Sequence, residues 1–483
     1  MKIRRLIPSL PYSTEEWAAE ARFLHWLTLF WLGIGLVVLF SASYHAGAIE
    51  SGDGLYYSKR QLLGVILGLL GFCAVIHIPL YKLMKVSAFG FFLFLMLIFA
   101  TKIPGLGITI NGATRWIDIG PFPLQPSELI KPFLILQSAY IFNRWSRLTL
   151  GERLWWLFLF ALTLLGILVQ PNLSTTALCG MTLWLIALAA GLRYQSLFLT
   201  ALAGVGLAAV SVLRNPYQQS RILSFLNPWA DALGDGFQLH QSLLAVGSGG
   251  ILGVGFGESQ LKLSYLPIQH TDFIFAVFAE EFGLLGGFCF LLLLGTYSFL
   301  ALRVAMKSTH VIQRLVAIGA MIFLVGQALI NIGVVIGVLP TTGLPLPMFS
   351  YGGNSMIASL LIAGLLIRAA RESQSADVVA IPHHEGESPS LIRLVGDHSS
   401  VATARHGSSA NALSGPQTSL HPRENGPLKL VRKRKPTSLW RRILAKLRSS
   451  KGVASATARK NDPKAALAAK KQRLKQRRKH RLR

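Results

Sequence analysis

The chain has 483 residues, of which 52% are hydrophobic and only 14% are charged, and its mean hydropathy is +0.48. This composition excludes an ordinary soluble globular protein and predicts an all-α polytopic membrane protein. The net charge is +27, and most of it lies beyond residue 371.

Ten apolar runs follow one another after a short N-terminal segment, residues 1–22. A membrane-spanning helix needs about 20 apolar residues to cross roughly 30 Å of hydrocarbon. Most of the runs reach that length, whereas the fourth and fifth are short and interrupted by polar residues. We therefore expect about ten transmembrane helices within residues 23–370, at 23–42, 61–80, 84–101, 129–142, 154–169, 173–191, 196–213, 272–302, 313–338 and 348–367.

Lysine and arginine are unevenly distributed among the short loops. If the N-terminus is cytoplasmic, every inner loop is basic, as at Lys82, Lys85 and Arg193. Positive residues in short loops favour the cytoplasmic side. This pattern predicts that both termini are cytoplasmic.

A polar cluster precedes the fourth run, on the predicted outer face. Pro126 suits the first turn of a helix, and Glu128 suits its positive N-terminal end. Glu128 and Lys131 are three residues apart, so they would share a face and form a charge pair at the membrane mouth. An interfacial anchor, with Trp116 at head-group level, explains the same residues equally well.

The largest segment between runs is the outer loop at residues 214–271. Loops of this length are usually functional, and its amphipathic stretches should fold against the outer ends of the spans. It contains GSGGILGVGFG, which neither follows a strand nor precedes a Lys-Ser/Thr pair. Close backbone packing is therefore a better interpretation than nucleotide binding.

Three carboxylates stand at the start of the eighth run: Asp272, Glu280 and Glu281. An ionised carboxylate near hydrocarbon costs several kcal/mol or becomes neutral, so chance is a poor explanation. In a helix Glu280 would lie about 12 Å deeper than Asp272, and Glu281 would point in roughly the opposite direction. The three cannot form one cluster, so we assign Asp272 to chemistry and both glutamates to buried pairing or packing.

Residues 337–356 hold three prolines and a Gly-Gly pair, which forbid a regular helix. Non-helical backbone at membrane depth survives only when it is buried in protein or lines a wet cavity. Broken helices of this kind often border a binding site.

Residues 371–483 have no apolar run of spanning length and carry 26 Lys and Arg against 7 Asp and Glu. This composition predicts a basic, mostly disordered cytoplasmic tail. Within it, residues 437–449 show an apolar stripe flanked by cations, which suits anionic lipid rather than nucleic acid.

Four long blocks, in order and at proper spacing, resemble the SEDS family of bacterial wall-synthesis proteins, which includes FtsW and RodA. The likeness covers roughly residues 20–370 and is nearer to the division branch, FtsW, than to the elongation branch. The blocks are NGATRWIDIGPFPLQPSELIK, SFLNPWADALGDGFQLHQSLLAVGSGGILGVGFG, YLPIQHTDFIFAVFAEEFG and PTTGLPLPMFSYGGNS.

This resemblance implies a peptidoglycan glycosyltransferase that polymerises lipid II, an undecaprenyl-pyrophosphate-linked disaccharide peptide, on the outer face of the bacterial inner membrane. It implies a class B penicillin-binding protein and other division proteins as partners, at the septum. The family's essential acidic residue matches Asp272, the proposed general base. The candidate substrate-binding residues are Arg115, Gln125, Ser127, Glu128, Lys131, Arg221, His270, Ser350 and Tyr351.

Two departures from the family pattern bear on a cofactor. Asn172 and Ile268 stand where relatives usually have Asp and Glu. An amide binds a divalent cation less well than a carboxylate does, so the metal question stays open and no cofactor is assigned. The alternatives are an elongation-type glycosyltransferase or a lipid II flippase, because intramembrane charges and broken helices also suit a transporter.

Overall fold

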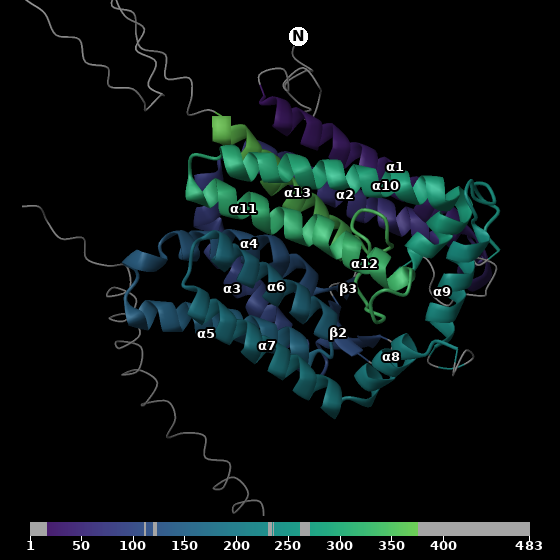
Figure 1. Cartoon of the computed structure of the whole chain (residues 1–483), viewed down its shortest axis with the longest axis horizontal. Coiled ribbons are helices and arrows are strands. Elements are labelled where there is room, and N and C mark those ends of the chain that lie inside the picture. The colour runs from purple at the N-terminus through teal and green to yellow at the C-terminus, as the bar shows by residue number, and fades with distance from the viewer. Residues whose placement is uncertain are drawn as a thin grey trace, which may run out of the picture. The chain divides into compact units, whose positions relative to one another are not determined.

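A computed structural model describes residues 17–110, 113–118, 123–229, 234, 236–260 and 271–374. The described part is almost entirely helical, which confirms the predicted class (Figure 1). The helices are α1 (Ala19–Ser51), α2 (Tyr56–His77), α3 (Leu80–Ala100), α4 (Pro126–Asn143), α5 (Leu150–Val169), α6 (Leu173–Ala189), α7 (Tyr194–Arg214), α8 (Pro216–Leu226), α9 (Phe237–Ser248), α10 (Ile274–Lys307), α11 (Val311–Met321), α12 (Gln327–Val335) and α13 (Gly353–Gln374).

Each predicted apolar run coincides with a helix, and α11 and α12 form one span through a π-helical turn, η4 (Ile322–Gly326). Among the described residues, eight spans are long and apolar enough to cross a membrane, and α4 and α6 are the shorter two. The prediction that the fifth run is short was wrong. Helix α5 begins at Leu150, four residues early, because Thr149 and Glu152 form a reciprocal capping box.

Helix α13 lies inside the bundle, where it packs against α1, α2, α4 and α11. Its Leu360, Ala363 and Leu366 are fully buried. Helix α7 is the opposite case: Leu197 is its one buried residue, and Leu199, Leu202 and other large apolar side chains are exposed. Exposed apolar faces on spanning helices are what a hydrocarbon environment requires.

The two ends of the described chain meet. The Arg371 guanidinium lies 4.3 Å from the Trp17 ring centroid, and it donates to the Ile76 carbonyl at 2.8 Å. The start of α1 and the end of α13 therefore lie at the same end of the bundle. These contacts extend the ordered domain slightly beyond the expected 23–370. The rest of the tail lies outside the described residues and stays a prediction.

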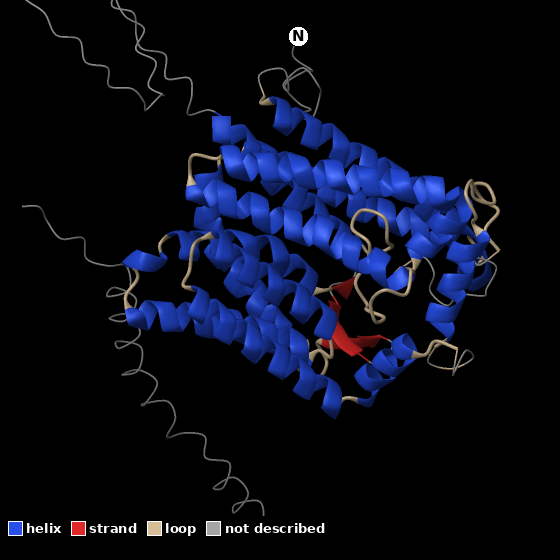
Figure 2. Cartoon of the chain, in the orientation of Figure 1, coloured by secondary structure: helices blue, strands red, loops and turns tan. Residues whose placement is uncertain are grey.

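At the opposite end of the bundle the chain forms a small antiparallel sheet that the sequence did not predict (Figure 2). Strands β1 (Gly107–Ile110), β2 (Ala113–Asp118) and β3 (Pro123–Leu124) pair in chain order. The outer loop supplies α8 and α9, and α9 packs on α10 and α12, which confirms that this loop folds against the spans.

The glycine-rich segment packs backbone to backbone against a break in α10. Gly283 has φ 64° and ψ −164°, so the helix is interrupted there. The freed carbonyls of Glu280 and Glu281 accept from the amides of Val254 and Gly255. The predicted close packing is therefore correct, because it replaces the helical hydrogen bonds that the break removes.

We expect Gly253→Ala to destabilise this contact. A Cβ at Gly253 would lie 2.1 Å from the Glu281 carbonyl oxygen, and its φ of +83° disfavours any side chain. The loss should be about 2 kcal/mol, measured as a lower unfolding temperature in detergent. Gly247→Ala is the matched control, because nothing lies within 4 Å of a Cβ there. Equal unfolding temperatures for the two variants would contradict the packing argument.

Residues 337–352 are non-helical and partly buried, as predicted, but the prediction extended to residue 356, and α13 already begins at Gly353. Leu344, Leu346, Met348 and Phe349 are at most 2% exposed. The segment reaches the middle of α1, where a Cβ on Gly35 would lie 2.0 Å from the Met348 carbonyl oxygen. This irregular backbone is thus enclosed by protein, which is the condition for it to persist at membrane depth.

Candidate functional site

Asp272 lies in the turn that precedes α10, at the end of the bundle that carries the sheet and α8. Its main-chain oxygen accepts a hydrogen bond of 2.7 Å from Asn331 Nδ2. The carboxyl group faces the α12–α13 loop, because a Cβ on Gly343 would lie 3.6 Å from Asp272 Oδ2. Asp272 therefore sits where the outer loop, α12 and the irregular segment meet.

Ser350 holds this turn in place. Its hydroxyl donates to the Thr271 carbonyl at 2.6 Å and accepts from the Leu346 amide at 2.8 Å. The side chain is buried. Ser350 was predicted to bind substrate. In the structure its hydroxyl bonds the residue before Asp272, and main-chain groups of the protein supply both of its hydrogen-bond partners.

Two arginines approach the carboxyl group of Asp272 from different elements. Arg115, on β2, donates to the carbonyls of Gln170 and Pro171 at 2.9 and 2.6 Å. Arg221, on α8, donates to the Thr341 carbonyl at 3.2 Å and stacks on Tyr217 at 4.6 Å. Folding thus brings together Arg115, Arg221 and Asp272, which lie at least 51 residues apart in the sequence.

Burial raises the pKa of Asp272 to about 6, while the charges of Arg221 and Arg115 oppose the rise and that of Glu128 adds to it. Burial likewise lowers the pKa of the Arg115 guanidinium. A carboxylate with a pKa near 6 is ionised at neutral pH and is a stronger base than an ordinary aspartate. The arrangement suits proton abstraction beside two cations.

Glu128 and Lys131 form the predicted charge pair at the start of α4. Lys131 Nζ lies 2.7 Å from Glu128 Oε1, and the two side chains are 2% and 4% exposed. Such burial excludes the interfacial anchor, which would hold the charges at head-group level. Lys131 also donates to Gln327 Oε1 at 3.1 Å. Within the described part of the chain, Glu128 Oε2 and the neighbouring Ser127 hydroxyl are buried without a hydrogen-bond partner, as a site for a polar ligand would leave them.

The remaining candidates are placed less closely. Gln125 is the residue before α4 and makes no side-chain cap. Tyr351 packs edge-on against Tyr57, with ring centroids 5.0 Å apart. His270 lies outside the described residues.

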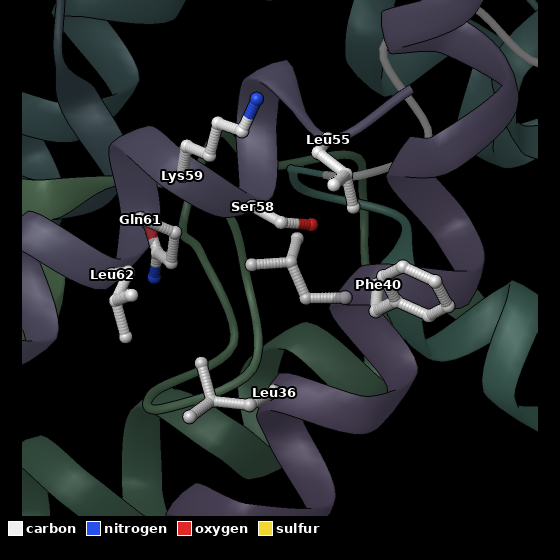
Figure 3. Close-up of a pocket in the computed structure, with 8 residues that line it drawn as sticks. Leu36, Phe40, Leu55, Ser58, Lys59, Gln61 and Leu62 are labelled. Carbon is white, nitrogen blue, oxygen red and sulfur yellow. The ribbon is translucent and has the colours of Figure 1, made fainter. Parts of the chain in front are cut away.

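An apolar groove of about 260 Å³ runs between α1 and α2 (Figure 3). Leu36, Phe40 and Leu62 line it. Gln61, on the same wall, donates to the Ser350 carbonyl at 3.3 Å and accepts from the Gly352 amide at 3.0 Å. Gln61 therefore links α2 to the segment that holds Thr271.

Glu280 and Glu281 have structural partners. Glu280 accepts from the Ser259 hydroxyl and from the Gln260 amide at 3.2 Å, and Glu281 accepts from the Ser41 hydroxyl at 2.5 Å. Both are buried inside α10. These contacts support the packing role assigned to them.

Within the described ranges, no three His, Cys, Asp or Glu side chains are grouped so that they could hold a metal ion. Asn172 Oδ1 accepts from the Thr175 amide at 3.3 Å and caps α6. Its oxygen is committed to the helix N-terminus, so this position does not fit a cation ligand. A metal requirement stays untested.

Sequence reasoning missed two residues of the site, Gln327 and Asn331. They lie four residues apart on α12 and are buried, and both contact the loop before α13. The available signal was a pair of amides at helical spacing in an otherwise apolar run. Intramembrane polar residues of that kind usually face a site or a partner.

Residues 22–375 match the family model for FtsW, RodA and SpoVE, described as cell cycle protein. The chain is 53% identical over 379 residues to a Synechocystis protein named probable peptidoglycan glycosyltransferase FtsW, covering 78% of this chain and 96% of that one. Among solved structures, a chain described under "Structural coordination of polymerization and crosslinking by a peptidoglycan synthase complex" is 28% identical, with a TM-score of 0.60 and coverage of 74% and 99%. RodA from Thermus thermophilus is 25% identical, with a TM-score of 0.55, and the match covers 74% of this chain and 98% of RodA.

Proposed function

Since the chain belongs to the FtsW/RodA/SpoVE family of cell cycle proteins, we propose that this peptidoglycan glycosyltransferase polymerises lipid II, with Asp272 as its general base. The observation that carries the proposal is the convergence of Asp272, Arg115, Arg221 and Glu128 from four separate elements. The protein is an integral membrane protein, and the site lies at the end of the bundle opposite the start of α1 and the end of α13.

The geometry supports a direct displacement. Asp272 takes the proton from a sugar hydroxyl of one lipid-linked molecule while that oxygen forms a bond to the anomeric carbon of the other. The bond from that carbon to the pyrophosphate breaks, and the pyrophosphate leaves with the electron pair. Arg115, whose Nη1 makes no hydrogen bond within the described residues, and Lys131 are suited to hold the pyrophosphate.

The activity should depend on pH through Asp272. The carboxylate must be ionised to accept a proton, and burial raises its pKa to about 6. We therefore expect kcat/KM for polymerisation to fall as pH drops through about 6 and to level off above it. Initial rates in detergent between pH 5 and 8 measure this. A rate that stays level down to pH 5, as an aspartate with the ordinary pKa of about 4 would give, would contradict the buried base.

A class B penicillin-binding protein is the proposed partner, with action at the division septum. The support is the solved peptidoglycan synthase complex, whose description joins polymerisation to crosslinking. Both termini are proposed to be cytoplasmic, with the basic tail near anionic lipid.

The experiment that tests the function uses purified full-length protein in detergent with labelled lipid II, with and without a class B transpeptidase. Glycan polymer is the expected product. A flippase only moves lipid II from one side of a bilayer to the other. Detergent contains no bilayer, so a flippase yields no polymer there. Absence of polymer from well-folded protein, even with the transpeptidase, would reject the proposal and favour the transporter.

A further inference from the structure

Two buried amides on α12 hold both halves of the site. Asn331 Nδ2 donates to the Asp272 carbonyl at 2.7 Å and to the Leu344 carbonyl at 2.9 Å. Gln327, one turn earlier, accepts from Lys131 at 3.1 Å and donates to the Pro345 carbonyl at 2.7 Å. Helix α12 therefore contacts the turn that contains Asp272, the Lys131 ammonium group, and the loop between α12 and α13.

The orientation of the Asn331 amide is determined by its partners. Two carbonyl oxygens can accept only from the NH₂ group, so the side chain cannot be flipped without losing both bonds. Asn331 Oδ1 is then buried without a hydrogen-bond partner among the residues that the structure describes. A buried unpaired oxygen is unfavourable, so packing alone does not explain an asparagine here.

The π-helical turn explains why these residues face the site. Residues Ile322–Gly326 end directly before Gln327. A π-turn rotates the residues after it relative to a regular helix, and such turns are frequent at functional sites. Phe323, inside the turn, lies 5.9 Å from Lys131 Nζ by its ring centroid. Phe323 of the π-helical turn and Gln327 thus contact Lys131, while Asn331 contacts Asp272.

We infer that Asn331 is a positioning residue for Asp272, and that with Gln327 it fixes the distance between the base and Lys131. This inference rests on the proposed function. Asn331 does not touch the reacting atoms. It holds the main chain of Asp272, and a misplacement of about 1 Å in such a group lowers the rate by roughly 100-fold.

Asn331→Leu tests the role, because leucine has a similar volume but donates no hydrogen bond. We expect kcat/KM to fall by about 10- to 100-fold, with the acid limb of the pH profile moving below 6 as the released turn admits water. The charged groups that face Asp272 stay in place: Arg221 on α8, Arg115 on β2 and Glu128 on α4. A shift of the acid limb therefore reports a change in the turn that contains Asp272, not a change in the neighbouring charges.

A second readout does not require activity. Labelling of the Asp272 carboxyl by a water-soluble carbodiimide and an amine, read by mass spectrometry, should be faster in Asn331→Leu and in Asn331→Ala than in wild type. Ser242→Ala is the matched control, because its hydroxyl also bonds a carbonyl of α12, that of Val335, at 2.8 Å. This variant should label at the wild-type rate.

Unchanged labelling of Asp272 in both Asn331 variants would overturn the inference, whatever the activity. So would a fall in rate with the acid limb still near pH 6, because that result describes a merely structural residue. If wild type makes no polymer while the Asn331 variants label faster, the proposed function fails and the positioning role stands.

Discussion

We expect replacement of Asp272 with asparagine to lower glycan polymerisation by about 100-fold or more, the usual scale for a positioned acid or base. The amide keeps the size of the side chain and removes the proton acceptor. The Asn331 and Ser350 bonds to residues 271–272 involve main-chain oxygens, so the turn should remain folded. Polymer formed from labelled lipid II in detergent, with binding of lipid II measured separately, is the appropriate assay.

Asp53→Asn serves as the control for this change. Asp53 follows α1 and pairs with Lys59 at 2.8 Å, and both side chains are exposed. An exposed ion pair contributes little to stability because water screens it, so polymerisation should stay within about twofold of wild type. Equal rates for wild type and Asp272→Asn would show that Asp272 is not the base.

The second large effect concerns the buried pair Glu128–Lys131. The sequence alone predicts that Lys131→Ala impairs substrate use more than folding. The structure changes that expectation, because both side chains are nearly fully buried. Removing one partner of a buried pair leaves an uncompensated charge and costs about 3–5 kcal/mol. We therefore expect Lys131→Ala to lose both polymerisation and thermal stability in detergent.

A double variant separates the two losses. Lys131→Met with Glu128→Gln removes both charges and keeps the volumes, so stability should return close to wild type. Polymerisation should stay at least about 100-fold reduced, because the cation proposed to hold the pyrophosphate is still missing. A stable double variant with wild-type activity would assign the pair to folding alone.

The helices and their order could be predicted from the sequence because a spanning helix satisfies its own backbone hydrogen bonds and needs only local apolar residues. The interruption after α12 was visible for the same reason, since prolines and glycines act locally. The start of α5 was missed because the capping by Thr149 and Glu152 lies outside the apolar run. The sheet was missed because its strands are short and pair within a loop.

For the site, the sequence by itself identified Asp272 as a carboxylate out of place near hydrocarbon and Glu128–Lys131 as a charge pair at the start of a span. It also gave Arg115 and Arg221 as candidate substrate-binding cations. Only the tertiary structure decided which of them meet. It placed the charges of Arg115 and Arg221 near Asp272 and the Ser350 hydroxyl on the Thr271 carbonyl. It also brought Gln327 to Lys131 and Asn331 to the Asp272 carbonyl. Desolvation and hydrogen-bond geometry depend on neighbours more than 50 residues away in the chain. Local sequence determines where a charge lies along a helix, but packing determines what surrounds it and therefore its pKa and its role.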